Sequence, residues 1–213
     1  MPDKIAKNKT GNSLMRCELL PEHPDFCRLN SIVGIAVDLR YVGVNNFVGR
    51  DLYGDVDCAW LHKEAAAALQ RAVQLLAISY PEWTLLVLDA LRPHRVQEML
   101  WQHLAGTPLQ LYVADPARGS IHSFGMAVDV TLVDRTGHEI DMGSAFDEFS
   151  EKSHPDLEAT LLAEKKITLQ HVANRDILRT VMLGAGFHGI HSEWWHFNLG
   201  DVAVVRAQYL RID

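Results

Sequence analysis

Two short segments constrain the fold of this chain most strongly, because each places carboxylate and imidazole side chains among apolar, strand-forming residues. The first is SIHSFGMAVDV, in which Gly125 lies between His122 and Asp129. On one straight strand this spacing would span roughly 23 Å and would leave the two side chains on opposite faces. Glycine allows a sharp turn between them. We therefore expect His122 on a loop and Asp129 on the strand that follows.

Asp129 interrupts an apolar run and needs a compensating group. Val128, Val130 and Leu132 have the opposite parity, so their side chains face away from that of Asp129 on a strand. A carboxylate among apolar neighbours requires a cation or hydrogen bonds. A metal ion is one candidate partner. The structural alternatives are an ion pair with an arginine or a loop cap, with His122 at the surface.

The second segment is HSEWWHFNL, which contains Glu193 and His196. Its aromatic residues favour a strand over a helix. Positions three apart face opposite sides of a strand, so we expect Glu193 at a bend before the strand and His196 on it. An imidazole is a good zinc ligand, and a carboxylate that does not bind the metal can take a proton from metal-bound water. The alternative is a core strand with an incidental histidine, and His188 and His191 are competing ligands.

Hydrophobic periodicity predicts an α+β fold with a mainly antiparallel central sheet flanked by helices, in a single domain. The strands and helices alternate without a regular βαβ rhythm. We expect residues 1–30 to form an N-terminal arm packed on a domain of residues 31–213. The predicted strands are 32–42, 83–91, 127–133 and 194–200, and the predicted helices are 60–79, 93–105, about 155–166 and 174–185, the last capped by Asn174.

Composition excludes several classes of protein. The 213 residues are 48% hydrophobic, which is enough for one core, and the net charge of -7 argues against a nucleic-acid partner. No apolar run is long enough to span a membrane. The N-terminal residues lack the apolar region of a secretion signal, so we expect a cytoplasmic protein if Met1 is the natural start, and a periplasmic one if it is not. No sequence pattern indicates the oligomeric state.

The cysteines fit a reducing compartment better than a disulfide framework. They are few and odd in number, and none forms a Cys-x-x-Cys pair. We expect free thiols, with a Cys17–Cys27 disulfide as the alternative.

The motifs SIHSFGMAVD and EWWH together resemble the D-alanyl-D-alanine dipeptidases of the VanX type, within the zinc D-Ala-D-Ala peptidases and their hedgehog-like fold group. The shared pattern is Ser-x-His, six residues, Asp, and a distal Glu-x-x-His. VDLRYVGVNNFVG, LDALRPHRVQ, and DMGSAFDEFS followed by SHP resemble further segments of that family. The likeness runs from about Val37 to Phe197.

The resemblance implies one Zn²⁺ per chain, bound by His122, Asp129 and His196. It implies that Glu193 is the general base, and later the acid, as zinc-bound water hydrolyses D-Ala-D-Ala to two D-alanines. Arg92 would stabilise the oxyanion. The implied context is cell-wall biogenesis or degradation.

The resemblance also implies a substrate pocket lined by Tyr41, Ser120 and Asp147. Asp147 suits the ammonium group of a dipeptide and Ser120 suits its carboxylate. The segment between Arg92 and Ser120 looks shorter than in some members of the family, which affects the rim of the pocket. Tyr41 as ordinary core, Arg92 in a structural salt bridge and Asp147 as a turn residue are the structural alternatives.

Three other functions are compatible with parts of the pattern. A D,D-carboxypeptidase or an L,D-type endopeptidase would act on peptidoglycan peptides and would need an open cleft. A hedgehog-type module would bind zinc without turnover, although Glu193 and Arg92 argue for catalysis. A purely structural protein would bind no zinc.

Overall fold

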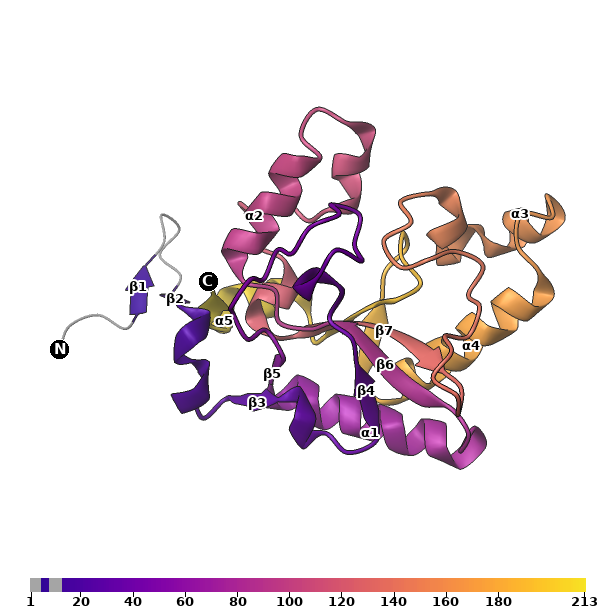
Figure 1. Cartoon of the computed structure of the whole chain (residues 1–213), viewed down its shortest axis with the longest axis horizontal. Coiled ribbons are helices and arrows are strands. Elements are labelled where there is room, and N and C mark those ends of the chain that lie inside the picture. Colours follow the sequence, from indigo (N-terminus) through magenta and orange to yellow (C-terminus); the bar gives the residue numbers. More distant parts are fainter. Residues whose placement is uncertain (1–4, 8–12) are drawn as a thin grey trace.

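The computed structural model describes residues 5–7 and 13–213, and a five-stranded sheet forms its centre (Figure 1). The strand order is β4-β6-β7-β9-β8. Only β4 and β6 pair in parallel, and the other three pairs are antiparallel. This mainly antiparallel sheet with flanking helices confirms the predicted α+β class. The strands are β4 (Ile35–Val37), β6 (Thr84–Asp89), β7 (Ala127–Val133), β8 (Phe187–Gly189) and β9 (His196–Leu199).

Two long helices cover one face of the sheet, α1 (Lys63–Ser79) and α4 (Leu169–Gly184) (Figure 1). The apolar residues of α1 recur at three- and four-residue spacing, which places them on one face of the helix. That face packs with α4 and with alternate residues of β6 and β7 in the main core. The buried residues of this main core include Leu69, Ala72, Leu76, Leu85, Val87, Val128, Val130, Leu132, Leu178 and Met182.

The shorter elements surround this layer. They are the helices α2 (His94–His103), α3 (Glu158–Ala163) and α5 (Val202–Gln208), and two small sheets made of β1 (Ile5–Lys7), β2 (Ser13–Met15) and β10 (Arg211–Ile212), and of β3 (Phe26–Arg28) and β5 (Trp60–His62). The β3–β5 pairing ties part of the predicted arm to the rest of the chain. Residues 1–4 and 8–12 of that arm lie outside the described residues.

Several predicted boundaries were wrong. Residues 60–62 were expected to be helical but form β5, because they pair with β3, and α1 begins at Lys63. The predicted strand 32–42 is reduced to β4, which is followed by a 3-10 helix at Arg40–Val42. Strands β6 and β9 are likewise shorter than the predicted 83–91 and 194–200.

The helix predicted at 174–185 starts earlier, at Leu169, and Asn174 is not its N-cap. Thr168 forms a capping box with His171, in which the Thr168 side chain accepts a hydrogen bond from the His171 backbone N–H at 3.2 Å. The side chain of Asn174 instead donates to the carbonyl of Asp141 at 2.7 Å. Asn174, which local propensity predicted as the N-cap, therefore makes a tertiary contact instead.

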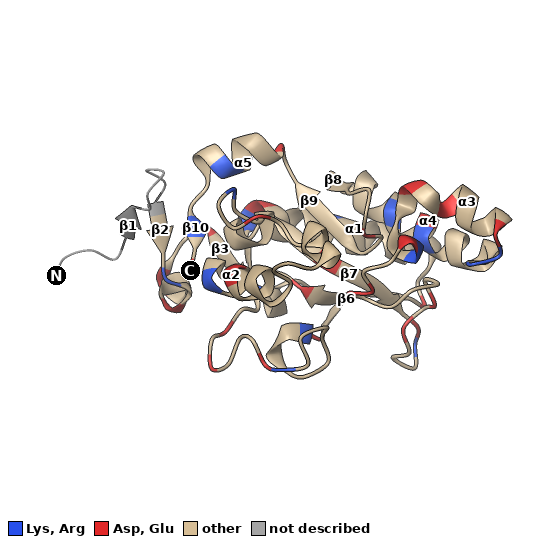
Figure 2. Ribbon diagram, turned by 90° about the horizontal axis from the view of Figure 1, so that it is seen from above, with Lys and Arg blue, Asp and Glu red and all other residues tan. Residues whose placement is uncertain are grey.

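The three cysteines are free thiols in the structure, as expected. Among residues 5–7 and 13–213 no helix is long and apolar enough to cross a membrane. Acidic and basic positions are interspersed over the ribbon in the view of Figure 2.

The register of the sheet brings polar residues together on the face that α1 and α4 leave uncovered. In β7, Val128 and Val130 belong to the main core, and the side chain of Asp129 points to the other face, as its parity predicts. His196 lies directly opposite Asp129 on β9. A register shift between Val87 and Asp89 in β6 then places Asp89 opposite Asp129 on the other side.

Candidate metal centre

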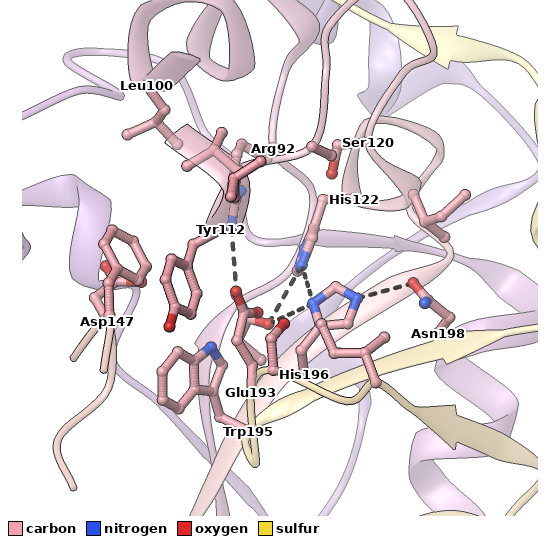
Figure 3. Close-up of a pocket in the computed structure, with 18 of the residues that line it drawn as sticks. Arg92, Leu100, Tyr112, Ser120, His122, Asp147, Glu193, Trp195, His196 and Asn198 are labelled. Carbon is pink, nitrogen blue, oxygen red and sulfur yellow. Dashed lines mark hydrogen bonds and ion pairs between the residues drawn. The ribbon is translucent and has the colours of Figure 1, made fainter. Parts of the chain in front are cut away.

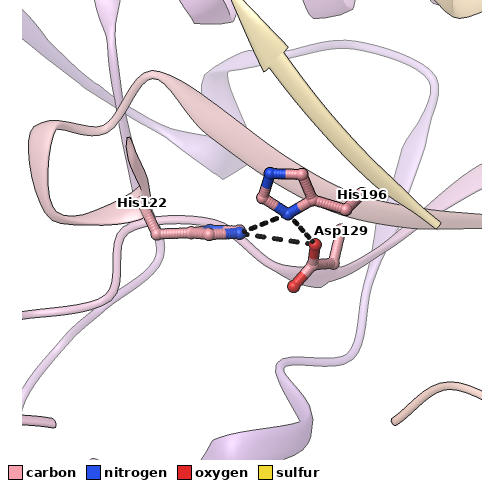
Figure 4. Close-up of side chains that lie close together, drawn as sticks. All are labelled: His122, Asp129 and His196. Atoms are coloured by element: carbon pink, nitrogen blue, oxygen red, sulfur yellow. Dashed lines mark hydrogen bonds and ion pairs between the residues drawn. The ribbon is translucent and has the colours of Figure 1, made fainter. Parts of the chain in front are cut away.

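His122, Asp129 and His196 converge on one point although they come from three different elements (Figure 4). Asp129 and His196 are cross-strand neighbours on β7 and β9. His122 lies on a 3-10 helix, Ile121–Phe124, that ends at Gly125. Gly125 has a left-handed φ of 65°, and a Cβ at this position would lie 2.7 Å from the backbone nitrogen of His62. The turn that delivers His122 therefore requires glycine.

The three facing atoms lie within hydrogen-bonding distance of one another. Nδ1 of His196 is 2.9 Å from Oδ1 of Asp129 and 3.1 Å from Nε2 of His122. Nε2 of His122 is 3.3 Å from the same carboxylate oxygen. His122 and Asp129 are almost completely buried, and His196 is half-buried.

The hydrogen bonds behind the imidazoles fix the chemistry of the facing atoms. Nδ1 of His122 lies 2.7 Å from the carbonyl oxygen of Ala90, to which it can only donate. Nε2 of His196 lies 2.9 Å from Oδ1 of Asn198, again an acceptor. In the neutral rings the other nitrogen of each is then an unprotonated acceptor. Three acceptors consequently face one another, and a shared cation satisfies all of them.

A zinc ion fits this donor set. Two imidazole nitrogens and one carboxylate oxygen are ordinary zinc ligands, and such bonds of roughly 2.0–2.2 Å imply ligand–ligand separations of about 3.3 Å in a tetrahedron. The observed separations of 2.9 to 3.3 Å are close to that value. The Ala90 carbonyl and Asn198 amide are the outer partners that commonly orient metal-binding imidazoles.

Asp129 is held in its ionised form. Burial alone would raise the pKa of its carboxyl group, but the imidazoles of His122 and His196 hold this pKa well below the usual range. A deprotonated carboxylate is the form that binds a metal.

Arg92 connects this cluster to a second buried carboxylate. Its guanidinium lies 2.8 Å from Oδ2 of Asp89 and 3.3 Å from Oδ2 of Asp129, and it donates to Oε1 of Gln97 at 3.0 Å. It also stacks over the ring of Tyr41, with 5.0 Å between Cζ and the ring centroid. The register shift in β6 places the carboxylates of Asp89 and Asp129 on adjacent strands. Two buried negative charges this close need a positive charge between them, and Arg92 supplies it.

Glu193 lies in the bend before β9, as the sequence predicts, and its side chain is nearly buried at the cavity wall beside His196 (Figure 3). Among residues 5–7 and 13–213, no group donates a hydrogen bond to its carboxylate. Burial is the main cause that raises the pKa of Glu193 to about 8, and the negative charges of Asp129 and Asp147 add to it. A carboxyl group with a pKa near neutrality is able both to accept and to return a proton.

The remaining predicted residues also line the same cavity, which has a volume of about 310 Å³. This volume is at the small end of the range for ligand sites. Tyr41 donates from its hydroxyl to Asp147, at 3.0 Å to Oδ2. In Figure 3 Asp147 lies to the left of the two imidazoles and Ser120 lies above them. Burial raises the pKa of Asp147 to about 8.

Sequence reasoning missed several residues of the cavity wall. Asn198 is two positions beyond His196 on β9, and this same-face spacing was an available signal. The rim is aromatic: the ring of Tyr112 stacks on Phe149 with 5.2 Å between centroids, and its hydroxyl lies 2.8 Å from Nε2 of His154. These contacts join segments far apart in the sequence, and no local pattern indicates them. Arg206 of α5 also lines the cavity.

A cluster able to hold a metal ion, beside a buried carboxylate in a small cavity of an α+β domain, is the arrangement that a metal-dependent peptidase requires. The sequence model of the D-ala-D-ala dipeptidase family matches residues 25–212. The chain therefore belongs to the D-ala-D-ala dipeptidase family, which confirms the resemblance seen in its motifs.

Individual relatives agree with this assignment. The chain is 38% identical over 169 residues to the D-alanyl-D-alanine dipeptidase of Escherichia coli (strain K12), a match that covers 79% of this chain and 81% of the relative. It is 31% identical to the D-alanyl-D-alanine dipeptidase of Synechocystis sp. over 62% of this chain and 66% of the relative. It is 32% identical to that of Enterococcus faecium over 83% of this chain and 92% of the relative.

Replacing Asn198 tests whether its hydrogen bond orients His196 for zinc binding. The Asn198→Ala variant loses the acceptor that fixes the tautomer of His196, so we expect its zinc affinity to fall about 10- to 100-fold. Competition with a chelator of known affinity measures this change. An unchanged zinc affinity would show that the hydrogen bond with Asn198 does not prepare His196 for zinc binding.

Proposed function

We propose that this protein hydrolyses D-Ala-D-Ala to two D-alanines with one zinc ion per chain. The observation that carries the proposal is the position of Glu193, whose buried carboxylate shares a small cavity with the converging His122, Asp129 and His196. The names of the relatives support the choice of substrate. A bound zinc ion would polarise the scissile carbonyl. It would also lower the pKa of a water molecule, so that the water can lose a proton and attack the carbonyl carbon.

Glu193 moves the proton. One of its carboxylate oxygens accepts a proton from the attacking water and later delivers it to the departing amine nitrogen. The absence of a hydrogen-bond donor to this carboxylate among the described residues leaves its oxygens available to the water. The pKa of about 8 that burial gives this carboxyl group suits both halves of the cycle.

Arg92 would stabilise the negative charge that grows on the carbonyl oxygen. Its contacts with Asp89 and Asp129 hold the guanidinium in place before the substrate arrives, so little reorganisation is needed during the reaction. Losing one such electrostatic partner typically costs about 2.7–4 kcal/mol of transition-state stabilisation.

Two polar groups of the cavity wall would bind the two charged ends of a free dipeptide. Asp147, with Tyr41 bonded to its carboxylate, suits the substrate ammonium. Ser120, which lines the same cavity away from Asp147, suits polar contact near the substrate carboxylate. Recognition of both charged termini inside a cavity of about 310 Å³ selects a dipeptide over a longer chain.

A comparison of substrates tests this proposal. We expect hydrolysis of free D-Ala-D-Ala and little hydrolysis of a peptidoglycan peptide that ends in the same two residues, because the longer chain lacks the ammonium at the required position. Faster cleavage of the peptidoglycan peptide would favour a D,D-carboxypeptidase or an L,D-type endopeptidase.

The pH dependence of KM tests the role of Asp147. Its pKa is about 8 in the cavity, so below this pH the carboxyl group is mostly protonated and binds an ammonium weakly. We expect KM for D-Ala-D-Ala to fall by up to about tenfold per unit as pH rises from about 6 toward 8. Above about 8 it should rise again as the substrate amine loses its proton.

The Asp147→Asn variant is the matched control, because it keeps the shape of the side chain and removes its titration. Its KM should be higher and should vary little between pH 6 and 8. A wild-type KM that is constant over this range would exclude Asp147 as the partner of the ammonium.

A further inference from the structure

The loop that carries Asp147 holds this residue in an unfavourable backbone conformation. Asp147 has a φ of 60°, in the left-handed region that residues other than glycine adopt only uncommonly. Such a conformation persists only where surrounding contacts determine it. The contacts that hold this loop therefore decide where the Asp147 carboxylate lies in the cavity.

Arg175 of α4 supplies contacts on both sides of Asp147. Its Nε donates to the carbonyl oxygen of Met142 at 2.7 Å, and its NH2 donates to the carbonyl oxygen of Lys152 at 2.8 Å. These two carbonyls lie five residues before and five residues after Asp147 in the chain. Arg175 is only 2% exposed, so both hydrogen bonds are shielded from water. One planar guanidinium thus ties the two ends of the loop together.

The loop and the residue just before it are held at two further points outside the main cavity. Asn174 donates to the carbonyl of Asp141 at 2.7 Å. Trp194, next to Glu193, donates from its indole nitrogen to Oγ of Ser144 at 2.9 Å. Trp194 and Arg175 both line a separate cavity of about 240 Å³. The loop is therefore fastened to α4 and to the bend before β9.

We propose that Arg175 is a positioning residue for substrate recognition, which fixes the carboxylate of Asp147 where it meets the ammonium of the dipeptide by bonding both ends of the Met142–Lys152 loop. This inference rests on the proposed function. It adds a residue of α4 to the determinants of specificity, although Arg175 acts only through the loop.

Arg175→Lys is the informative variant, because it keeps the charge but cannot make both hydrogen bonds of the guanidinium. Arg179→Lys is the matched control. Arg179 lies one turn later on α4 and shares the partner Glu158 with Arg175, but within the described part of the chain it bonds to Glu158 and Asp176 and not to the loop. The control therefore separates loss of the loop contacts from loss of the ion pair with Glu158.

The readout is the ratio of kcat/KM for D-Ala-D-Ala to kcat/KM for propionyl-D-alanine, which keeps the amide and lacks the ammonium. We expect Arg175→Lys to lower this ratio about tenfold or more, the effect of losing roughly one charged contact. Arg179→Lys should change it by less than about twofold. In the Asp147→Asn background, Arg175→Lys should cause no further change, because both act through the same carboxylate.

A purely structural role for Arg175 predicts a different result. Arg175→Lys would then lower the melting temperature, or lower kcat/KM equally for both substrates, and would leave the ratio unchanged; this outcome overturns the inference. If Arg175→Lys does not fold, Ser144→Ala loosens the same loop at its contact with Trp194 and must shift the ratio in the same direction. A wild type that does not hydrolyse D-Ala-D-Ala would instead overturn the proposed function.

Discussion

The Glu193→Gln variant is expected to lose hydrolysis of D-Ala-D-Ala while it still binds one zinc ion per chain. Glutamine has nearly the same size as glutamate but cannot accept the proton of the attacking water. General acid–base groups typically contribute about 10²- to 10⁴-fold to a rate, so kcat should fall by at least that factor. Zinc content should be unchanged, because the converging cluster is His122, Asp129 and His196.

Kinetic assays beside metal analysis of the same preparation measure both quantities. Glu82→Gln is a matched control, because Glu82 is an exposed glutamate that lies outside the cavity and pairs with Arg135. It should keep wild-type turnover. Wild-type turnover in Glu193→Gln would remove Glu193 as the base, and loss of zinc from that variant would make it a ligand instead.

The His122→Ala variant is expected to lose the metal as well as the activity. Removing one of the three proposed ligands leaves Asp129 and His196, and it also removes the hydrogen bond to the Ala90 carbonyl. A ligand at about 1,000 times its dissociation constant stabilises the native state by about 4 kcal/mol. For a chain of this size that corresponds to a rise in melting temperature of roughly 8–16 °C.

Wild-type protein should show this rise when zinc is added to the chelated form, and His122→Ala should show little or none. His188→Ala is the matched control, because His188 is exposed and lies close to His196 in the sequence. It should retain the full thermal response to zinc. A His122 variant that binds zinc as the wild type does would exclude this residue as a ligand.

The place of each residue of the two motifs could be predicted because strand parity and one glycine are local signals, whereas the convergence of the motifs on one point was implied by the family resemblance. The parity of Asp129 against Val128 and Val130 indicated which face it would occupy, and Gly125 indicated a turn that brings His122 back. The bend at Glu193 followed from its three-residue spacing to His196. Each of these conclusions depends on the geometry of a few neighbouring residues.

The environment of Arg92 could not be predicted in the same way. The arginine bridges Asp89 and Asp129 because a register shift in β6 brings the two carboxylates opposite each other. Register depends on pairing between strands that are distant in the sequence. The hydrogen bonds from Arg175 to the loop around Asp147 and the contact between Tyr112 and His154 are likewise tertiary and have no local signature.

Helix boundaries show the same limit on a smaller scale. Asn174 has a good N-cap side chain, but Thr168 caps α4 and Asn174 bonds to the Asp141 carbonyl. The periodicity of α1 was correct, yet its first three predicted residues pair with β3. Local propensity identified that the helices exist, and tertiary pairing decided where they begin.

Turnover of D-Ala-D-Ala during stepwise return of zinc to chelated protein tests the zinc-dependent mechanism most directly. We predict no hydrolysis in the metal-free chain, followed by a linear increase that stops at one zinc per chain. Full turnover without metal would contradict the account. So would one tightly bound zinc with no cleavage of any dipeptide, which would point to a binding module.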